Sequence, residues 1–130
     1  MTAKRVLFLD DDPWRHKMVR PHMRYDAAHT AADCIRLLAE GDYDVVFLDH
    51  DLGGTQMVES EGPEETGYTV AKWMGENRPA VGLVVVHSLN PVGRANMLAL
   101  LRSAGYETLE CPFFRLVPEL PKILAQEPAA

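Results

Sequence analysis

Residues 44–52 read DVVFLDHDL, an unbroken apolar run that ends abruptly in acidic residues. Continuous apolar runs of this kind are typical of strands that are covered on both faces, as in a parallel sheet. VLFL at 6–9 and VGLVVVH at 81–87 repeat the pattern, and weaker strand signals lie in YDAAHT at 25–30 and YETLEC at 106–111. The sequence therefore predicts five strands.

Helix signals separate these strands. Thr and Asn are favoured N-caps, proline suits the first helical position, and glycine commonly follows the last turn. In chain order, the expected helices start and stop at Thr30 and Gly41, at Thr66 and Asn77, and at Asn90 and Gly105. The alternation of strands and helices predicts an α/β fold, in which a doubly wound, five-stranded parallel sheet lies between two layers of helices.

The first and last helices have features of their own. Four basic residues fall on the expected first helix, either as a solvated face or as a surface for a partner or a phosphate. They are Arg15, Lys17, Arg20 and Arg24. Pro118 and Pro121 interrupt the pattern of residues 115–125, and proline disrupts helix interiors. We therefore expect the last helix to be shortened to one or two turns.

Composition and charge describe one globular domain over residues 1–130, with a core at 5–114 and a frayed tail at 126–130. Of the 130 residues, 47% are apolar, so the chain can bury a sizeable core without a disulfide or a structural metal. The net charge of −6 argues against duplex DNA as the main partner.

Nothing in the sequence indicates export or a membrane. The apolar run that follows Lys4 and Arg5 is too short for a signal peptide, and no stretch approaches a membrane span. Cys34 and Cys111 lack metal-ligand spacing, which suits a reducing compartment. A cytoplasmic location is expected.

Polar residues follow three of the expected strands, at the edge where open parallel sheets bind ligands. They are Asp10, Asp11 and Asp12 after the first strand, Asp49, His50 and Asp51 after the third, and His87, Ser88 and Asn90 after the fourth. So many carboxylates would repel one another in a partly desolvated cleft, so we expect a divalent cation there. Oxygen ligands favour Mg²⁺, and the histidines extend the choice to Mn²⁺ or Zn²⁺. The expected metal ligands are Asp10, Asp11, Asp49 and Asp51.

A different explanation is that these carboxylates only cap helices, which Asp12 before Pro13 fits best. The glycine-containing segment 53–65 follows Asp51 and is long enough to be functional or mobile.

Four segments together resemble the receiver domains of two-component response regulators. They are VLFLDDDP at 6–13, DVVFLDHDL at 44–52, VVVHS at 84–88 and CPF at 111–113. The resemblance implies an acidic metal-binding pair at Asp10 and Asp11, a phosphoacceptor at Asp49, and a Ser or Thr position at Ser88. Cys111 stands where receivers have a lysine, which puts ordinary phosphorylation of Asp49 in doubt because a cation that stabilises the transferring phosphoryl group is lost.

The combination of DHD at 49–51 with HSLNPVGRANM at 87–97 resembles a derived branch, the cyclic-phosphate processing receiver domains. That resemblance implies binding or hydrolysis of a cyclic phosphate, as a nucleotide or an RNA end. Opening the ring needs a base or nucleophile, a cation and an acid. The expected catalytic residues are Asp49, His50, His87 and Ser88. His87 has an alternative as a core residue, because strand alternation points it away from Ser88.

The phosphate itself would be held at the start of the helix that begins at Pro91. Free backbone N–H groups at a helix N-terminus bind anions. The expected phosphate-binding residues are Ser88, Asn90, Gly93 and Arg94, with Asn90 explained equally as a helix cap. Gly93 would allow close approach, and Arg94 or Arg115 could supply positive charge.

Two further functions stay open. The first is an atypical receiver that acts as a signalling or protein-interaction module, with or without phosphorylation at Asp49. The second rests on LDDD at 9–12, which resembles the nucleophile motif of haloacid-dehalogenase-like phosphatases, with Asp10 and Asp12 as its acids and Ser88 as the second motif. Those enzymes also need a lysine and a late acidic pair, and no aspartate follows Asp51. This alternative therefore ranks last.

Overall fold

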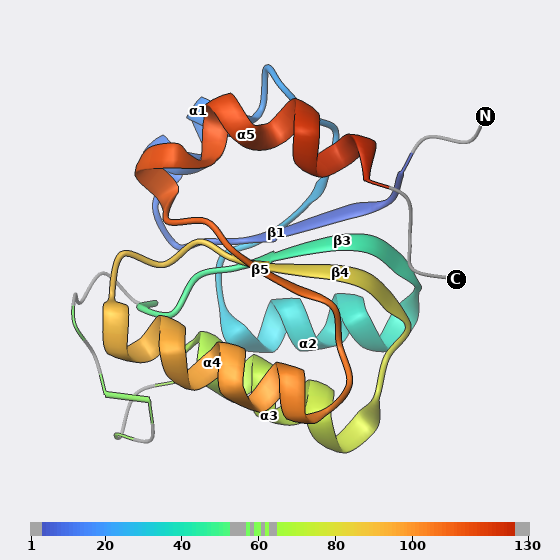
Figure 1. The fold of residues 1–130 in the computed structure, drawn as a ribbon, viewed down its shortest axis with the longest axis vertical. Coiled ribbons are helices and arrows are strands. Elements are labelled where there is room, and N and C mark those ends of the chain that lie inside the picture. The colour runs from blue at the N-terminus through green and yellow to red at the C-terminus, as the bar shows by residue number, and fades with distance from the viewer. Residues whose placement is uncertain (1–3, 53–56, 58, 61, 63–64, 127–130) are drawn as a thin grey trace.

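Five parallel strands form one sheet in the order β2-β1-β3-β4-β5 (Figure 1). The strands are β1 (Val6–Leu9), β2 (Asp26–Ala28), β3 (Tyr43–Leu48), β4 (Val81–Val86) and β5 (Thr108–Glu110). The computed structural model describes residues 4–52, 57, 59–60, 62 and 65–126. All five predicted strands are present, and the predicted α/β fold with a parallel sheet is confirmed.

Helices cover both faces of this sheet (Figure 1). They are α1 (Pro13–Val19), α2 (Ala31–Glu40), α3 (Gly67–Asn77), α4 (Pro91–Ser103) and α5 (Phe113–Ala125). α1 and α5 lie on one face, and α2, α3 and α4 lie on the other. The structure therefore has the three layers that the alternating pattern predicts.

Alternate residues of the central strands supply two separate cores, because successive side chains of a strand point to opposite faces. Leu9, Leu48 and Val86 pack on the face of α2, α3 and α4. Phe8 and Phe47 pack on the face of α1 and α5. This alternation, called strand parity below, decides to which face of the sheet the polar residue directly after each strand points.

The helices begin where local capping predicts. Thr30 accepts a hydrogen bond from the backbone N–H of Asp33 at 3.1 Å, and Asn90 accepts one from Gly93 at 3.0 Å. Thr66 and Thr69 form a capping box at the start of α3. Side-chain caps satisfy N–H groups that the helix leaves unpaired. The predicted starts of α2, α3 and α4 are therefore confirmed.

The prediction of a shortened last helix is wrong. α5 runs without a break over 13 residues, with Pro118 and Pro121 inside it. A proline within a helix costs about 3 kcal/mol. One face of α5 compensates, since each fully buried large apolar side chain contributes about 1.5–3 kcal/mol. The buried side chains on this face are Phe113, Leu116, Leu120 and Ile123.

The first helix is shorter than its run of basic residues. α1 ends at Val19, with Arg20 as the C-cap residue, so Arg24 lies beyond the helix. Residues 127–130 of the expected tail, and most of the segment 53–65, lie outside the described residues. Within the described part of the chain, no helix is long and apolar enough to cross a membrane.

Candidate functional site

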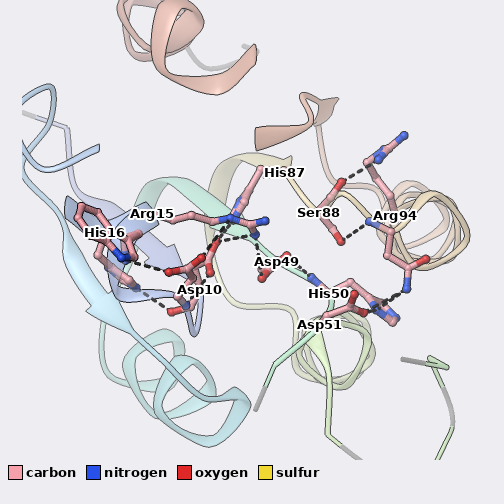
Figure 2. A network of polar contacts seen from close by, with 12 residues as sticks. Asp10, Arg15, His16, Asp49, His50, Asp51, His87, Ser88 and Arg94 are labelled. Carbon is pink, nitrogen blue, oxygen red and sulfur yellow. Dashed lines mark hydrogen bonds and ion pairs between the residues drawn. The ribbon is translucent and has the colours of Figure 1, made fainter. Parts of the chain in front are cut away.

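The central strands end in register, which brings three polar residues together. Leu9 of β1 pairs with Leu48 of β3, and Leu48 pairs with Val86 of β4. The next residue of each strand therefore stands beside the others at the carboxyl edge of the sheet. These residues are Asp10, Asp49 and His87. By strand parity, their side chains point to the face of α1 and α5 (Figure 2).

A pocket of about 320 Å³ opens at this edge. Its walls combine acidic side chains with a few apolar ones. The lining residues are Asp11, Asp12, Pro13, Arg15, Asp49, Asp51, Met57, Ser88, Leu89 and Asn90. The predicted cleft at the ends of β1, β3 and β4 is therefore present, and Arg15 is the basic residue in its wall.

Asp10 lies at the buried centre of the polar network (Figure 2). Its Oδ2 is 2.9 Å from Nε2 of His87 and 3.3 Å from Nη1 of Arg15, and its Oδ1 accepts the backbone N–H of Asp12 at 2.9 Å. Burial acts to raise the pKa of Asp10, but the hydrogen bond from His87, the backbone hydrogen bond from Asp12 and the charge of Arg15 together outweigh it and lower the pKa. Asp10 is therefore ionised at neutral pH.

Asp49 is also buried, but its environment has the opposite effect. Burial, followed by the negative charge of Asp10, raises the pKa of Asp49 to about 8. Nη1 of Arg15 is 3.6 Å from its Oδ2, and the backbone N–H of His50 donates to its Oδ1 at 3.0 Å. These two contacts do not offset the desolvation of the carboxylate. Asp49 therefore holds a proton at neutral pH until another cation neutralises the cluster.

His87 is a buried residue that contacts the acidic cluster. Its ring stacks on Phe8, with centroids 4.8 Å apart, and meets the edge of Phe113. Burial lowers the pKa of His87, so the ring is neutral and donates Nε2–H to Asp10. Its Nδ1 has no hydrogen-bond partner among the described residues. Strand alternation does point His87 away from Ser88, and the ring holds Asp10 in place from behind the pocket wall.

His50 occupies a different compartment from Asp49. Parity turns its ring toward α4, where Nδ1 is 2.8 Å from Oδ1 of Asp51 and Nε2 is 2.9 Å from Oγ of Ser60. A Cβ atom added to Gly93 would stand 2.4 Å from Cγ of His50. Glycine at 93 is therefore explained by the packing of His50 beneath α4.

The predicted metal ligand Asp51 and the predicted phosphate-binding residues Asn90 and Arg94 make hydrogen bonds within the protein. Asp51 accepts Asn90 Nδ2 at 3.1 Å through Oδ1 and the backbone N–H of Met57 through Oδ2 at 2.6 Å, so both its oxygens are engaged. Arg94 pairs with Glu110 at 2.7 Å and donates to the backbone oxygen of Ser88 at 2.7 Å. Among the predicted site residues, those that line the pocket beside Arg15 are Asp11, Asp49, Asp51, Ser88 and Asn90.

Comparison with known proteins identifies the family. Residues 5–103 match the family model described as the cyclic-phosphate processing receiver domain. The chain belongs to this family. Among curated proteins, no significant match to this receiver domain is found.

Solved structures of receivers share the fold at low sequence identity. A response regulator from Colwellia psychrerythraea gives a TM-score of 0.65 at 17% identity, over 97% of this chain and 100% of that one. A response regulator from Thermotoga maritima, solved in complex with Mg(2+)-BeF, gives 0.61 at 22% identity, over 93% and 98%. A CheY-like receiver domain protein from Methanospirillum hungatei gives 0.58 at 16%, over 95% and 94%. This receiver domain therefore has the flavodoxin-like receiver fold.

The donor atoms of this receiver domain fit a divalent cation. Asp10, Asp49 and His87 each offer one ligand atom, and these atoms lie within 4.8 Å of one another. Carboxylate oxygens are the donors that Mg²⁺ and Mn²⁺ prefer. Asp11, which lines the pocket, is close enough to raise the pKa of Asp49 by its charge. The carboxylates of Asp10 and Asp49 therefore lie close enough to share a cation, and Asp11 and Asp51 lie in the wall of the adjoining pocket.

Sequence reasoning did not place His16 or Arg15 among the acids, although Arg15 was one of the four basic residues expected to form a solvated face or a surface for a partner or a phosphate. His16 contacts the backbone oxygen of Asp10 with Nε2 at 2.7 Å, and Arg15 joins the carboxylates themselves. Residues three apart on a helix are neighbours, so the spacing of Asp12 and Arg15 was the available signal. Cys111, at the position of the receiver lysine, is buried, and burial raises the pKa of its thiol. Cys111 is therefore neutral and supplies no positive charge.

Proposed function

We propose that this receiver domain binds Mg²⁺ or Mn²⁺ through Asp10, Asp11 and Asp49, and with it binds a cyclic phosphate in the adjoining pocket. One observation carries the proposal: carboxylates from β1 and β3 converge within 4.8 Å at a pocket of about 320 Å³. A pocket of this size is within the range for small ligands. The membership in the cyclic-phosphate processing family supports the class of ligand.

The geometry favours binding over ring opening. Both histidines that were expected to act as acid and base are buried, and neither is among the residues that line the described pocket. The metal would supply charge neutralisation for the phosphate, Ser88 offers a hydroxyl in the pocket wall, and Asp49 anchors the cation. We therefore propose a sensor of the cyclic phosphate, whose turnover is a separate outcome of the same assay.

Calorimetric titration with 2′,3′-cyclic AMP tests the proposal. We expect binding in Mg²⁺ or Mn²⁺, loss of binding in EDTA, and loss in Asp49→Asn. Asp42→Asn, an exposed acid that precedes β3 at the opposite edge of the sheet, is the matched control and should bind as the wild type does. An oligonucleotide with a 2′,3′-cyclic end distinguishes an RNA end from a mononucleotide, and linear 3′-AMP measures selectivity for the ring. Equal affinity with EDTA and with metal would contradict the proposal.

The arrangement of Asp49 and Ser88 also favours a second candidate, a signalling receiver that is phosphorylated at Asp49 and docks a protein partner. Both residues line the pocket, at the positions where receivers place the phosphoacceptor and its hydroxyl neighbour. Incubation with acetyl phosphate and Mg²⁺, followed by mass spectrometry of the intact chain, tests it. A phosphoryl adduct that Asp49→Asn abolishes would favour signalling, and no adduct would favour ligand binding.

A further inference from the structure

Arg15 is held loosely among the carboxylates that the metal would take. Its Nη1 is 3.3 Å from Oδ2 of Asp10 and 3.6 Å from Oδ2 of Asp49, and its Nε is 3.9 Å from Oδ2 of Asp12. Charge-assisted hydrogen bonds between a guanidinium and a carboxylate are commonly 2.7–2.9 Å. The guanidinium is thus shared between three acids at longer distances, in an arrangement that a small divalent ion can displace.

The surroundings of Arg15 allow it to move without losing its support. The guanidinium lies 5.0 Å from the centre of the Phe113 ring, a cation–π contact from α5 that does not depend on the carboxylates. The side chain is 20% exposed and lines the pocket. Arg15 can therefore turn from the acids toward the pocket while it stays against Phe113.

Other candidates for a phosphate-binding cation are less well placed. Arg94 is committed to Glu110 and to the backbone oxygen of Ser88, both at 2.7 Å. The guanidinium of Arg115 lies 5.8 Å from the ring centre of Phe114, whose side chain is 74% exposed. Cys111 carries no charge. Arg15 is the basic side chain among the residues that line the described pocket.

We propose that Arg15 is the phosphate-binding residue of this site, and that it exchanges partners when the metal binds. Without metal, its guanidinium pairs with the carboxylate of Asp10 and contacts the carboxyl group of Asp49. Once a divalent cation takes those carboxylates, the positive charge of Arg15 becomes available to the phosphate of the ligand. This inference rests on the proposed function. Metal and phosphate then bind cooperatively, because the phosphate provides a new partner for the displaced guanidinium.

The test compares the full chain with Arg15→Gln, Arg15→Lys and the control Lys17→Gln, which removes an exposed charge from the same helix. Mn²⁺ affinity is measured first without nucleotide, and 2′,3′-cyclic AMP affinity is then measured at saturating Mn²⁺. Arg15→Gln should bind Mn²⁺ alone about 5-fold more tightly, a common size for coupling between two sites, because a competing charge is gone. It should bind the nucleotide about 10-fold more weakly, because a charge-assisted contact is lost.

Opposite changes in the two affinities are the signature of the exchange. By reciprocity, the nucleotide should tighten Mn²⁺ binding more in the wild type than in Arg15→Gln. Arg15→Lys keeps the charge, so its affinities for Mn²⁺ and for the nucleotide should lie between those of the wild type and Arg15→Gln. It also serves as the test variant if Arg15→Gln does not fold. Weaker Mn²⁺ binding by Arg15→Gln, or unchanged nucleotide affinity, would overturn the role of Arg15 alone. A wild type that binds no Mn²⁺ would overturn the proposed function as well.

Discussion

Replacement of Asp49 by asparagine should stabilise the metal-free protein, and by more as the pH rises. The pKa of Asp49 is raised from 3.8 to about 8 by burial and by Asp10. Because one pKa unit corresponds to about 1.4 kcal/mol, the shift sets an upper limit on the order of 5 kcal/mol for the energy that ionisable Asp49 costs above pH 8. Asparagine removes that cost but also loses the contact of Asp49 with Arg15, so we expect a net gain of about 2 kcal/mol.

The dependence on pH follows from proton counting. Between pH 4 and about 8 the folded protein holds a proton on Asp49 that the unfolded chain has released. The folded state therefore binds more protons, and its stability falls as the pH rises through this window. The stability of Asp49→Asn does not fall in this way. The difference in unfolding free energy between Asp49→Asn and the wild type should therefore be near zero at pH 4 and should grow to a plateau above pH 8.

Urea unfolding in EDTA at pH 5, 6, 7 and 8 measures the effect, with Asp42→Asn as the control for a lost exposed carboxylate. An advantage of Asp49→Asn that is absent, or equal at all four pH values, would refute the assignment of a proton to Asp49. Excess Mg²⁺ should then reverse the order of stability. A ligand at 100 times its Kd stabilises a protein by about 2.7 kcal/mol, which the wild type gains and Asp49→Asn does not.

Three other substitutions test the supports of the site by thermal or urea unfolding. His87→Leu should cost about 1–3 kcal/mol because Asp10 loses a buried donor, and pairing it with Asp10→Asn should recover part of the loss. Gly93→Ala should cost about 1–3 kcal/mol, since its Cβ would stand 2.4 Å from His50, while Gly75→Ala, whose nearest contact is 3.9 Å away, should be neutral or stabilising. Pro118→Ala should stabilise α5 by up to about 3 kcal/mol, and a loss of stability would show that the proline is required.

The fold could be predicted because its signals are local. An apolar run such as 45–48 specifies a strand covered on both faces, and Thr30, Thr66 and Asn90 start their helices with their own side chains. The continuity of α5 could not be predicted in the same way. It results from a balance between two prolines and the burial of one helix face against the sheet, and that burial depends on the whole fold.

The candidate site was only partly predictable, because proximity in sequence does not determine the side of the sheet. Asp49 and His50 are adjacent, yet parity sends Asp49 toward α1 and His50 toward α4. The alternation of side chains along β3 could be predicted from the sequence, but the residue at which the strand ends could not. A shift of one residue turns every side chain to the opposite face of the sheet. The contact of Arg15 with Asp49 could not be predicted for another reason, because it depends on how α1 packs on the sheet.

The crowding of acids that first pointed to a metal is relieved in two ways when no metal is bound. Asp10 stays ionised because His87 and Arg15 face it, while Asp49 keeps a proton because burial and Asp10 act on it together. Two neighbouring carboxylates with pKa values pushed apart share their charge in this manner. A divalent cation must therefore displace both the proton of Asp49 and the guanidinium of Arg15. On the proposed function, the same pair of displacements would couple metal affinity to pH through Asp49 and to phosphate through Arg15.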